Sequence, residues 1–274
     1  MKVRRPNLDF SKVQAHWAPC LEFAQRANAS GLIPTYVEPY LVKVMLKAKP
    51  LIDPGKAQLH ADVTVFCKQE AQHYKQHNAF NLSLRRGGYP GLAPLEKALS
   101  DDLERFLATR SLKFNLAYSD GFEAMGALGA QLWFDCYSEF LVGADPEVVE
   151  LWKWHMAEEY EHREVAFAVY HALYGENSLF DGWIYRVYGF LFAARHLMGF
   201  GNRAAAYLLS EDRKAMTASE RQASLAREAA FRKKLSRVAI PELLKVLSPF
   251  YNPAKRKAPA EVARYLNRFE EARA

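Results

Sequence analysis

The chain contains the pattern Glu-x-x-His twice, at Glu70–His73 and at Glu159–His162. Successive residues of an α-helix are rotated by about 100°, so residues three apart share a face and their side chains can reach the same metal ion. A single pair of this kind is common on a solvated helix. The second pair, however, lies among apolar residues, and burying acids and histidines without partners is costly. The two motifs therefore constrain the chain to a fold that brings two helices around a shared polar centre.

Helical spacing also dominates the rest of the chain. No sustained alternation of apolar and polar residues occurs, and no Asn-Gly or Asp-Gly turn joins apolar runs, so strand signals are scarce. The residues are 50% hydrophobic and 25% charged, which is ordinary for a globular protein. We predict an all-α fold with helices at about residues 18–29, 36–51, 54–84, 94–110, 113–141, 146–174, 179–209, 217–248 and 259–272.

Local signals set several of these boundaries. Asp53-Pro54 and Asp145-Pro146 each place an N-cap acceptor before a proline at the first helical position, where the missing N–H costs nothing. The Gly/Pro cluster at 86–91 ends one helix, and Gly175 ends another. The apolar segment 179–209 contains charged side chains that are costly in lipid, so we expect a buried bundle helix there rather than a membrane span.

Two histidines extend the motifs. Glu70, His73 and His77 fall within about 60° of one another on a helix, so His77 is either a further metal ligand or a partner of one. His155 lies four residues before Glu159 and therefore on the same face as Glu159 and His162.

A two-metal site in a four-helix bundle also takes one carboxylate from each of two further helices. Glu38 lies 15 residues before Asp53 and Glu70 lies 17 after it, so an antiparallel hairpin would bring the two glutamates to nearly the same height. Pro39 disfavours helical geometry at Glu38, so that helix either begins at Pro39 or is distorted there. Glu22 is the alternative ligand, but it lies too far from the turn to match Glu70 in a simple hairpin.

Glu123 is the candidate from the fourth helix. It lies 22 residues before Asp145, whereas Glu159 lies only 14 after it, so a longer loop after Leu141 has to absorb part of the difference. Asp120 and Asp135 are the alternatives. Small residues follow Glu123 on its own face and either leave space for a substrate or oxygen or allow close helix packing: Gly126, Ala127 and Ala130.

This ligand set predicts a ferritin-like four-helix bundle over residues 1–210, with additional N- and C-terminal helices. Residues 211–274 carry 15 Lys/Arg against 8 Asp/Glu, whereas residues 1–210 carry 22 against 23. We expect this basic extension to pack on the bundle with a solvated surface and to bind no nucleic acid. Contact with a membrane surface and assembly into a homodimer stay open.

Other sequence features indicate the cellular compartment and argue against several classes of enzyme. The three cysteines are far apart and form no Cys-x-x-Cys pair, and no apolar run follows the N-terminus, so we expect reduced thiols in a cytoplasmic protein. No Gly-x-Ser-x-Gly, Walker loop or dinucleotide fingerprint occurs. The remaining histidines stand alone and are expected to be structural: His16, His60, His171 and His196.

Two blocks carry a resemblance to known families: Gln69-Glu70-Ala71-Gln72-His73 with His77, and residues 154–162 with Val165-Ala166-Phe167. Through them the chain resembles a family of predicted metal-dependent hydrolases over about residues 15–250. It is more distantly similar to the p-aminobenzoate N-oxygenase family of di-iron enzymes, whose His-x-x-x-Glu-x-x-His arrangement is matched by His155, Glu159 and His162. That similarity implies that His155 is a metal ligand.

We expect two metal ions, with iron first and manganese or zinc as alternatives, because the ligands mix carboxylate and imidazole. The first functional hypothesis is a non-haem di-iron oxygenase or oxidase that uses O₂ to oxidise a small amine or hydrocarbon, with an electron-donor protein as a further partner. The alternative is a hydrolase that uses a metal-activated water. The third is a bundle that stores metal or binds a partner without catalysis.

Overall fold

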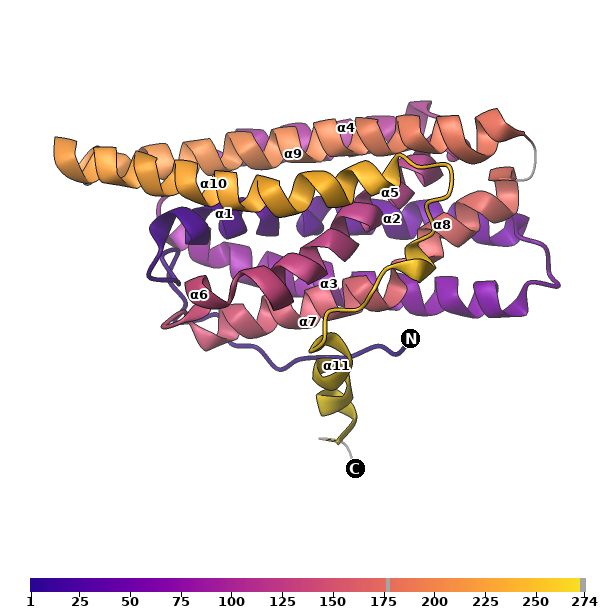
Figure 1. Cartoon of the computed structure of the whole chain (residues 1–274), viewed down its shortest axis with the longest axis horizontal. Coiled ribbons are helices and arrows are strands. Elements are labelled where there is room, and N and C mark those ends of the chain that lie inside the picture. The colour runs from indigo at the N-terminus through magenta and orange to yellow at the C-terminus, as the bar shows by residue number, and fades with distance from the viewer. Residues whose placement is uncertain (176–177, 272–274) are drawn as a thin grey trace.

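The computed structural model describes residues 1–175 and 178–271, and within these ranges the chain is helical and contains no strand. The predicted all-α fold is confirmed. The main helices are α1 (Leu21–Gly31), α2 (Pro34–Ala48), α3 (Ala57–Arg86), α4 (Leu92–Thr109), α5 (Leu112–Gln131), α6 (Ser138–Leu141), α7 (Pro146–His162), α8 (Val165–Tyr170), α9 (Tyr185–Asp212), α10 (Ala218–Val246) and α11 (Val262–Glu271) (Figure 1).

Four helices, α2, α3, α5 and α7, close around a common centre. The helix α2 packs on α3 and α5, and α7 packs on the same two helices from the other side. In Figure 1 α3 and α7 lie toward the bottom of the view, while α9 and α10 lie toward the top. The helix α9 covers α5 and α1, and α4 packs on α2 and α9. The finer assignment to a ferritin-like bundle stays a prediction.

The start of α2 differs from what Pro39 suggested. The helix begins at Pro34 and continues through Pro39, so Glu38 lies inside it. Pro34 occupies the first turn, where its missing N–H has no helical partner to lose. The expectation that the helix begins at Pro39 is therefore wrong, and Glu38 is held by a full turn of helix on its N-terminal side.

Two other boundaries were mispredicted for local reasons. Asp53 caps a turn, with Gly55 N–H donating to its carboxylate at 2.8 Å, and α3 begins three residues after Pro54, at Ala57. The helix α7 ends at His162 rather than continuing to Tyr174. Arg163 donates to the Tyr160 carbonyl at 2.7 Å, and this carbonyl would otherwise accept the next helical hydrogen bond. The Asp145-Pro146 start is confirmed, since Asp145 accepts from Glu147 N–H at 2.9 Å.

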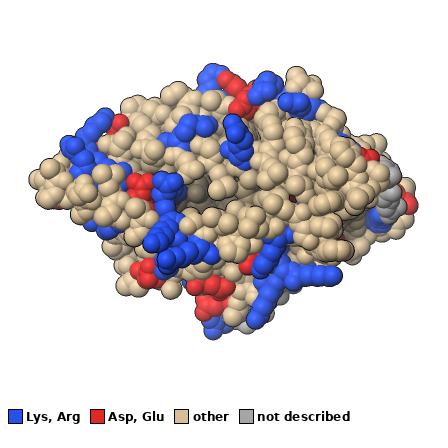
Figure 2. Space-filling model, turned by 45° about the horizontal axis from the view of Figure 1, so that its top comes forward, with Lys and Arg blue, Asp and Glu red and all other residues tan. Residues whose placement is uncertain are grey.

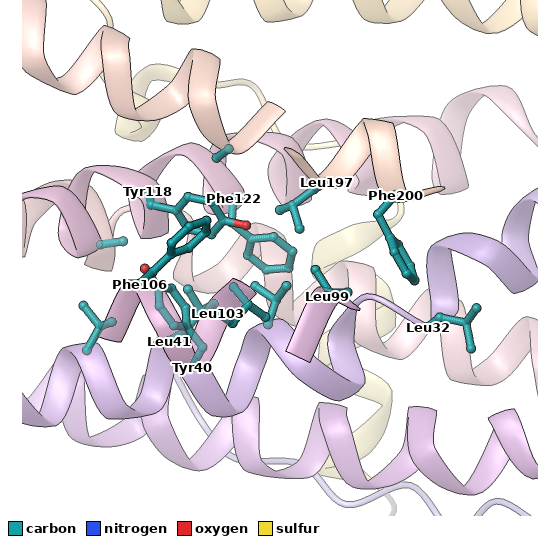
Figure 3. Packing of buried hydrophobic residues seen from close by; sticks show 14 of the residues in the cluster. Leu32, Tyr40, Leu41, Leu99, Leu103, Phe106, Tyr118, Phe122, Leu197 and Phe200 are labelled. Atoms are coloured by element: carbon teal, nitrogen blue, oxygen red, sulfur yellow. The ribbon is translucent and has the colours of Figure 1, made fainter. Parts of the chain in front are cut away.

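The largest hydrophobic core joins the metal-motif helices to the outer helices. Tyr40 and Leu41 of α2 meet Leu103 and Phe106 of α4, and Tyr118 of α5 packs with them (Figure 3). Tyr40 and Tyr118 pack edge to face with ring centroids 5.4 Å apart, and the Tyr40 hydroxyl donates to Asn115 at 2.7 Å. This packing fixes α2 against α5 and so sets the spacing of the centre between them.

The C-terminal helices pack on the bundle, α10 on α1 and α5 and α11 on α7. Arg227 of α10 pairs with the buried Glu22 at 2.9 Å. The division of the chain at residue 210 stays a prediction. Within the described ranges no helix, α9 included, is long and apolar enough to cross a membrane.

Candidate metal centre

Six carboxylates and imidazoles from α2, α3 and α7 converge in the interior. Two overlapping groups have ligand atoms within 4.8 Å of one another. These groups are Glu38, His73, His155 and Glu159, and Glu70, His73, Glu159 and His162. Every member has a relative exposure of 1% or less, so the groups are shielded from bulk water. The structure therefore brings together the four motif residues, Glu38 from the hairpin count, and His155 from the face of the second motif.

The distances show which atoms face one another. His155 Nε2 lies 3.1 Å from Glu38 Oε1 and 3.0 Å from Glu159 Oε1. On the other side, His162 Nε2 lies 3.4 Å from Glu70 Oε1. His73 Nδ1 lies between the two, 3.7 Å from Glu70 Oε2 and 3.9 Å from Glu159 Oε1. Glu159 and His73 are common to both groups.

Each inward-facing histidine is held by its other ring nitrogen. His73 Nε2 lies 2.9 Å from Glu158 Oε2, and His162 Nδ1 lies 3.0 Å from Glu123 Oε2. His155 Nδ1 shares a hydrogen bond of 2.7 Å with His77 Nε2. Metal-binding histidines typically have this arrangement, because the outer partner fixes the tautomer and the ring orientation.

These contacts narrow the roles predicted for two site residues, His77 and Glu123. His77 lies behind His155 rather than among the inward-facing atoms, so of the two roles left open for it the geometry favours the supporting one. Glu123 meets His162 and is outside both groups, although its Oε1 has no hydrogen-bond partner.

Most of the inward-facing atoms lack hydrogen-bond partners, the exception being His155 Nε2 and Glu159 Oε1, which lie 3.0 Å apart. Both carboxylate oxygens of Glu38 and of Glu70 are buried without a hydrogen bond, as are His73 Nδ1, His162 Nε2 and Glu159 Oε2. Buried polar atoms are nearly always hydrogen-bonded, so a cluster of unpaired carboxylate oxygens and ring nitrogens aimed at common points indicates a site that can bind cations. The donor set of carboxylates and imidazoles fits two divalent transition-metal ions.

The electrostatics agree with this interpretation. Burial raises the pKa of Glu38 well above its usual range, and the neighbouring Glu70 adds to the rise. Burial lowers the pKa of His162, but the carboxylates of Glu123 and Glu159 outweigh it and raise that pKa to about 9. Burial lowers the pKa of His155 well below its usual value. Without metal, protons therefore have to share a site that is crowded with carboxylates.

The alternative ligands lie elsewhere. Glu22 pairs with Arg227, and Asp120 lies 3.5 Å from the buried Arg186, with burial raising the pKa of Asp120 to about 6. Asp135 is exposed. Among the described residues, none of the four isolated histidines joins a candidate metal group. His16 contacts Tyr89 and Asp212, and His196 contacts Tyr118 and Asp102.

Comparison with protein families also indicates a metal-dependent protein. The model of a family described as predicted metal-dependent hydrolase matches residues 2–257. The chain belongs to this family. No curated protein and no solved structure matches the chain. The resemblance predicted from the two motif blocks is thus confirmed for the metal-dependent hydrolases, while the similarity to the p-aminobenzoate N-oxygenases stays a prediction.

In this member of the family, sequence reasoning missed the residues that hold His73. Glu158 is fully buried and accepts from the Arg4 backbone N–H and from its guanidinium, both at 3.2 Å. Arg4 also donates to Glu161 at 2.9 Å, and Gln69 donates to the same carboxylate at 2.8 Å. Glu158 directly precedes the motif residue Glu159 in the sequence, and this adjacency could have indicated a role for Glu158 at the site. Nothing near Arg4 in the sequence points to the motif.

Gly126 lets α5 approach the centre. A Cβ atom at this position would lie 1.9 Å from Glu159 Oε2, which no packing permits. Of the two roles left open for the small residues after Glu123, Gly126 therefore has the packing role, because it allows α5 to lie close to Glu159. It also borders a pocket, because Gly126, His155 and Glu159 are among the residues that line a cavity of about 310 Å³.

Proposed function

We propose that the chain is an enzyme with two metal ions bound between α2, α3, α5 and α7. Glu38 and His155 would hold one ion and Glu70 and His162 the other, with Glu159 and His73 placed between them. The observation that supports this most directly is the set of orphaned atoms: carboxylate oxygens and ring nitrogens, fully buried, meet without hydrogen bonds. Iron, manganese and zinc all suit this ligand set.

The protein residues have distinct tasks in this proposal. Glu158, His77 and Glu123 fix the rings of the three inward-facing histidines, so the donor nitrogens keep their directions when metal is absent. The carboxylates balance the metal charge in a site that excludes bulk water. When bound, two such ions either activate water or supply electrons to O₂.

Two reactions fit the centre, and different observations support each. The family description supports hydrolysis by a metal-activated water. The apolar walls beside His155 and Glu159 support O₂-dependent oxidation of a small apolar molecule, since few polar groups line the pocket to bind a hydrolysable polar group. Oxidation would also need an electron donor.

The metal proposal is tested by purifying the protein and its Glu159→Ala variant and measuring bound iron, manganese and zinc. We expect about two ions per chain in the parent and a large loss in the variant. A parent protein that holds no metal after reconstitution with any of the three would overturn the proposal.

The reaction is decided with the metal-loaded protein. Anaerobic reduction of an iron-loaded sample followed by exposure to O₂, with an oxygen electrode and optical spectra, tests oxidation. Release of p-nitrophenol from p-nitrophenyl octanoate tests hydrolysis by iron-, manganese- and zinc-loaded samples. Oxygen uptake that is lost in Glu159→Ala supports oxidation, whereas ester cleavage that depends on the metal and on Glu159, without oxygen uptake, supports hydrolysis.

A further inference from the structure

A pocket of about 310 Å³ lies against one side of the metal centre. Its walls come from α1, α5, α7, α9 and α10, and the start of α2 closes one end. The volume is about twice the roughly 150 Å³ that accommodates benzene in an engineered protein cavity. It is at the lower limit for small-molecule sites, which begin at about 300 Å³. A bicyclic aromatic or medium-chain aliphatic molecule would suit this space.

The lining is largely apolar. Phe122 and Met125 of α5, Leu197 of α9 and Phe231 and Leu235 of α10 supply much of the surface. Trp133 and Trp152 are stacked with ring centroids 4.8 Å apart and form a flat aromatic wall. An apolar surface of this kind binds by removing apolar area from water. Apart from His155 and Glu159, the polar side chains of the lining include Arg26, which is paired with Glu228, and Ser30, Tyr137 and Asn202.

One end of the pocket is the metal centre itself. His155 and Glu159 belong both to a candidate metal group and to the pocket lining. Glu159 Oε2 has no hydrogen-bond partner, so the pocket reaches a group that needs a cation. A molecule in the pocket would therefore lie beside the metals.

The outer wall is formed by α9 and α10. Met198 of α9 lines the pocket and is 50% exposed, so the lining continues to the surface there. Figure 2 shows a hollow on the face that these helices turn toward the viewer, with Lys and Arg side chains beside it. Arg26, at the α1 wall, pairs with Glu228 of α10 at 2.9 Å and ties the two helices across this region.

We infer that this pocket binds the organic substrate of the metal centre and that the substrate is an apolar molecule, aromatic or aliphatic, which enters between α9 and α10. The assignment as substrate rests on the proposed two-metal function, whereas binding of an apolar molecule does not. The two can therefore fail separately.

Two glycines of α9 provide a matched pair of variants. Gly201 lines the pocket, and a Cβ there would meet only Ile33, another lining residue, at 3.8 Å. Gly199 lies two residues earlier outside the lining, and its Cβ would meet only Arg203, at 3.4 Å. Both positions are helical and half-buried, so Gly→Phe changes helix propensity equally at each. Only Gly201→Phe should fill the pocket.

The experiment titrates N-phenyl-1-naphthylamine, a neutral apolar dye that brightens in apolar sites, into metal-free and metal-loaded protein. We expect saturable binding in both, competition by 1-decanol and none by glucose. Gly201→Phe should weaken binding roughly tenfold or more, while Gly199→Phe stays close to the parent. Circular dichroism and thermal unfolding establish that both variants fold.

Absence of saturable dye binding to the folded parent, or equal loss in the two glycine variants, overturns the pocket assignment whatever the metal content. Manganese-loaded parent protein then tests position: paramagnetic relaxation of bound 1-decanol protons, lost in Gly201→Phe, supports a substrate beside the metals. Dye binding with no relaxation enhancement in protein that holds manganese overturns the substrate role. Failure to load any metal counts against the two-metal proposal instead.

Discussion

The two sides of the candidate metal centre differ in polarity. Toward the N-terminal segment, Arg4, Glu158, Glu161 and Gln69 form a connected network of hydrogen bonds behind His73. Toward α9 and α10, the centre borders an apolar pocket whose polar groups are few. In the proposed enzyme the difference separates two tasks: the polar side would fix the ligands, and the apolar side would leave room for a molecule to approach them.

The shared carboxylate should matter most to both sides. Replacing Glu159 with Ala removes the one carboxylate that belongs to both candidate groups and to the pocket wall. We expect metal affinity to fall by about 100-fold or more, beyond the 10–100-fold typical of supporting residues. Metal analysis after dialysis checks this, with Glu164→Ala on the exposed surface after α7 as the control. Equal metal content in the two variants would refute the role of Glu159.

The polar side can be broken at Arg4. The Arg4 side chain is 6% exposed and pairs with the fully buried Glu158, so Arg4→Met removes the guanidinium and leaves that carboxylate with only His73 and the backbone N–H of residue 4. We expect a loss of about 3 kcal/mol in the free energy of unfolding. Metal affinity should fall about 10–100-fold, because His73 loses its fixed orientation. Arg5→Met, at an exposed neighbouring position, is the matched control. Denaturant titration and metal binding that do not distinguish the two variants would contradict the network's role.

Proton binding by the candidate ligands gives a smaller, graded effect of pH. The pKa of Glu38 is raised well above its usual range by burial, and the pKa of His162 is raised to about 9. His162 therefore holds a proton near neutral pH in the metal-free protein, and Glu38 binds a proton more readily than a free carboxyl group, so metal binding has to displace protons from the centre. Metal affinity should rise with pH, by about tenfold per unit if one proton leaves per ion. Calorimetry in two buffers with different ionisation enthalpies measures the release, and binding independent of pH between 6 and 8 would contradict it.

We expect the smallest effect from substitutions at two glycines of α5, Gly126 and Gly129, which face different residues of α7. Gly126→Ala would place a Cβ 1.9 Å from Glu159 Oε2, whereas Gly129→Ala would meet the flexible Met156 thioether at 2.6 Å. We expect Gly126→Ala to lower metal affinity about three- to tenfold by displacing the ligand. Gly129→Ala should leave metal affinity close to that of the parent and change only dye binding. A metal titration of both variants measures the difference, and the reverse order would place the sensitive contact in the pocket.

Much of the inner ligand set could be predicted because helical spacing is a short-range rule. Glu70 with His73, and His155 with Glu159 and His162, follow from positions three or four apart in one helix. Glu38 follows from counting along a hairpin. Its neighbour Pro39 was misleading, because a proline's preference at one residue is weaker than the packing of Tyr40 and Leu41 into the core.

What could not be predicted depends on contacts far apart in the chain. The partner of His73 comes from another helix, and Arg4 comes from a segment without helical pattern. For His155, the supporting role of His77 was one of two predicted roles, but which histidine it supports depends on how α3 packs on α7. The end of α7 at His162 coincides with a hydrogen bond from the Arg163 guanidinium to the Tyr160 carbonyl, a contact that spacing does not determine. The oxygenase and hydrolase hypotheses share nearly the same ligands, so no pattern of ligand residues separates them.

The contact between Arg4 and Glu158 spans 154 positions of the chain. Contacts of such separation close late in folding, because a long loop has to lose its freedom before the contact forms. Helical hairpins such as α2 with α3 can assemble earlier and bring Glu38 near Glu70. At that stage Glu158 and Arg4 have not yet fixed the orientation of the His73 ring. An ion captured at that stage would meet an incomplete set of donors. In the proposed two-metal enzyme, correct metal loading would then depend on when the segment around Arg4 closes on Glu158.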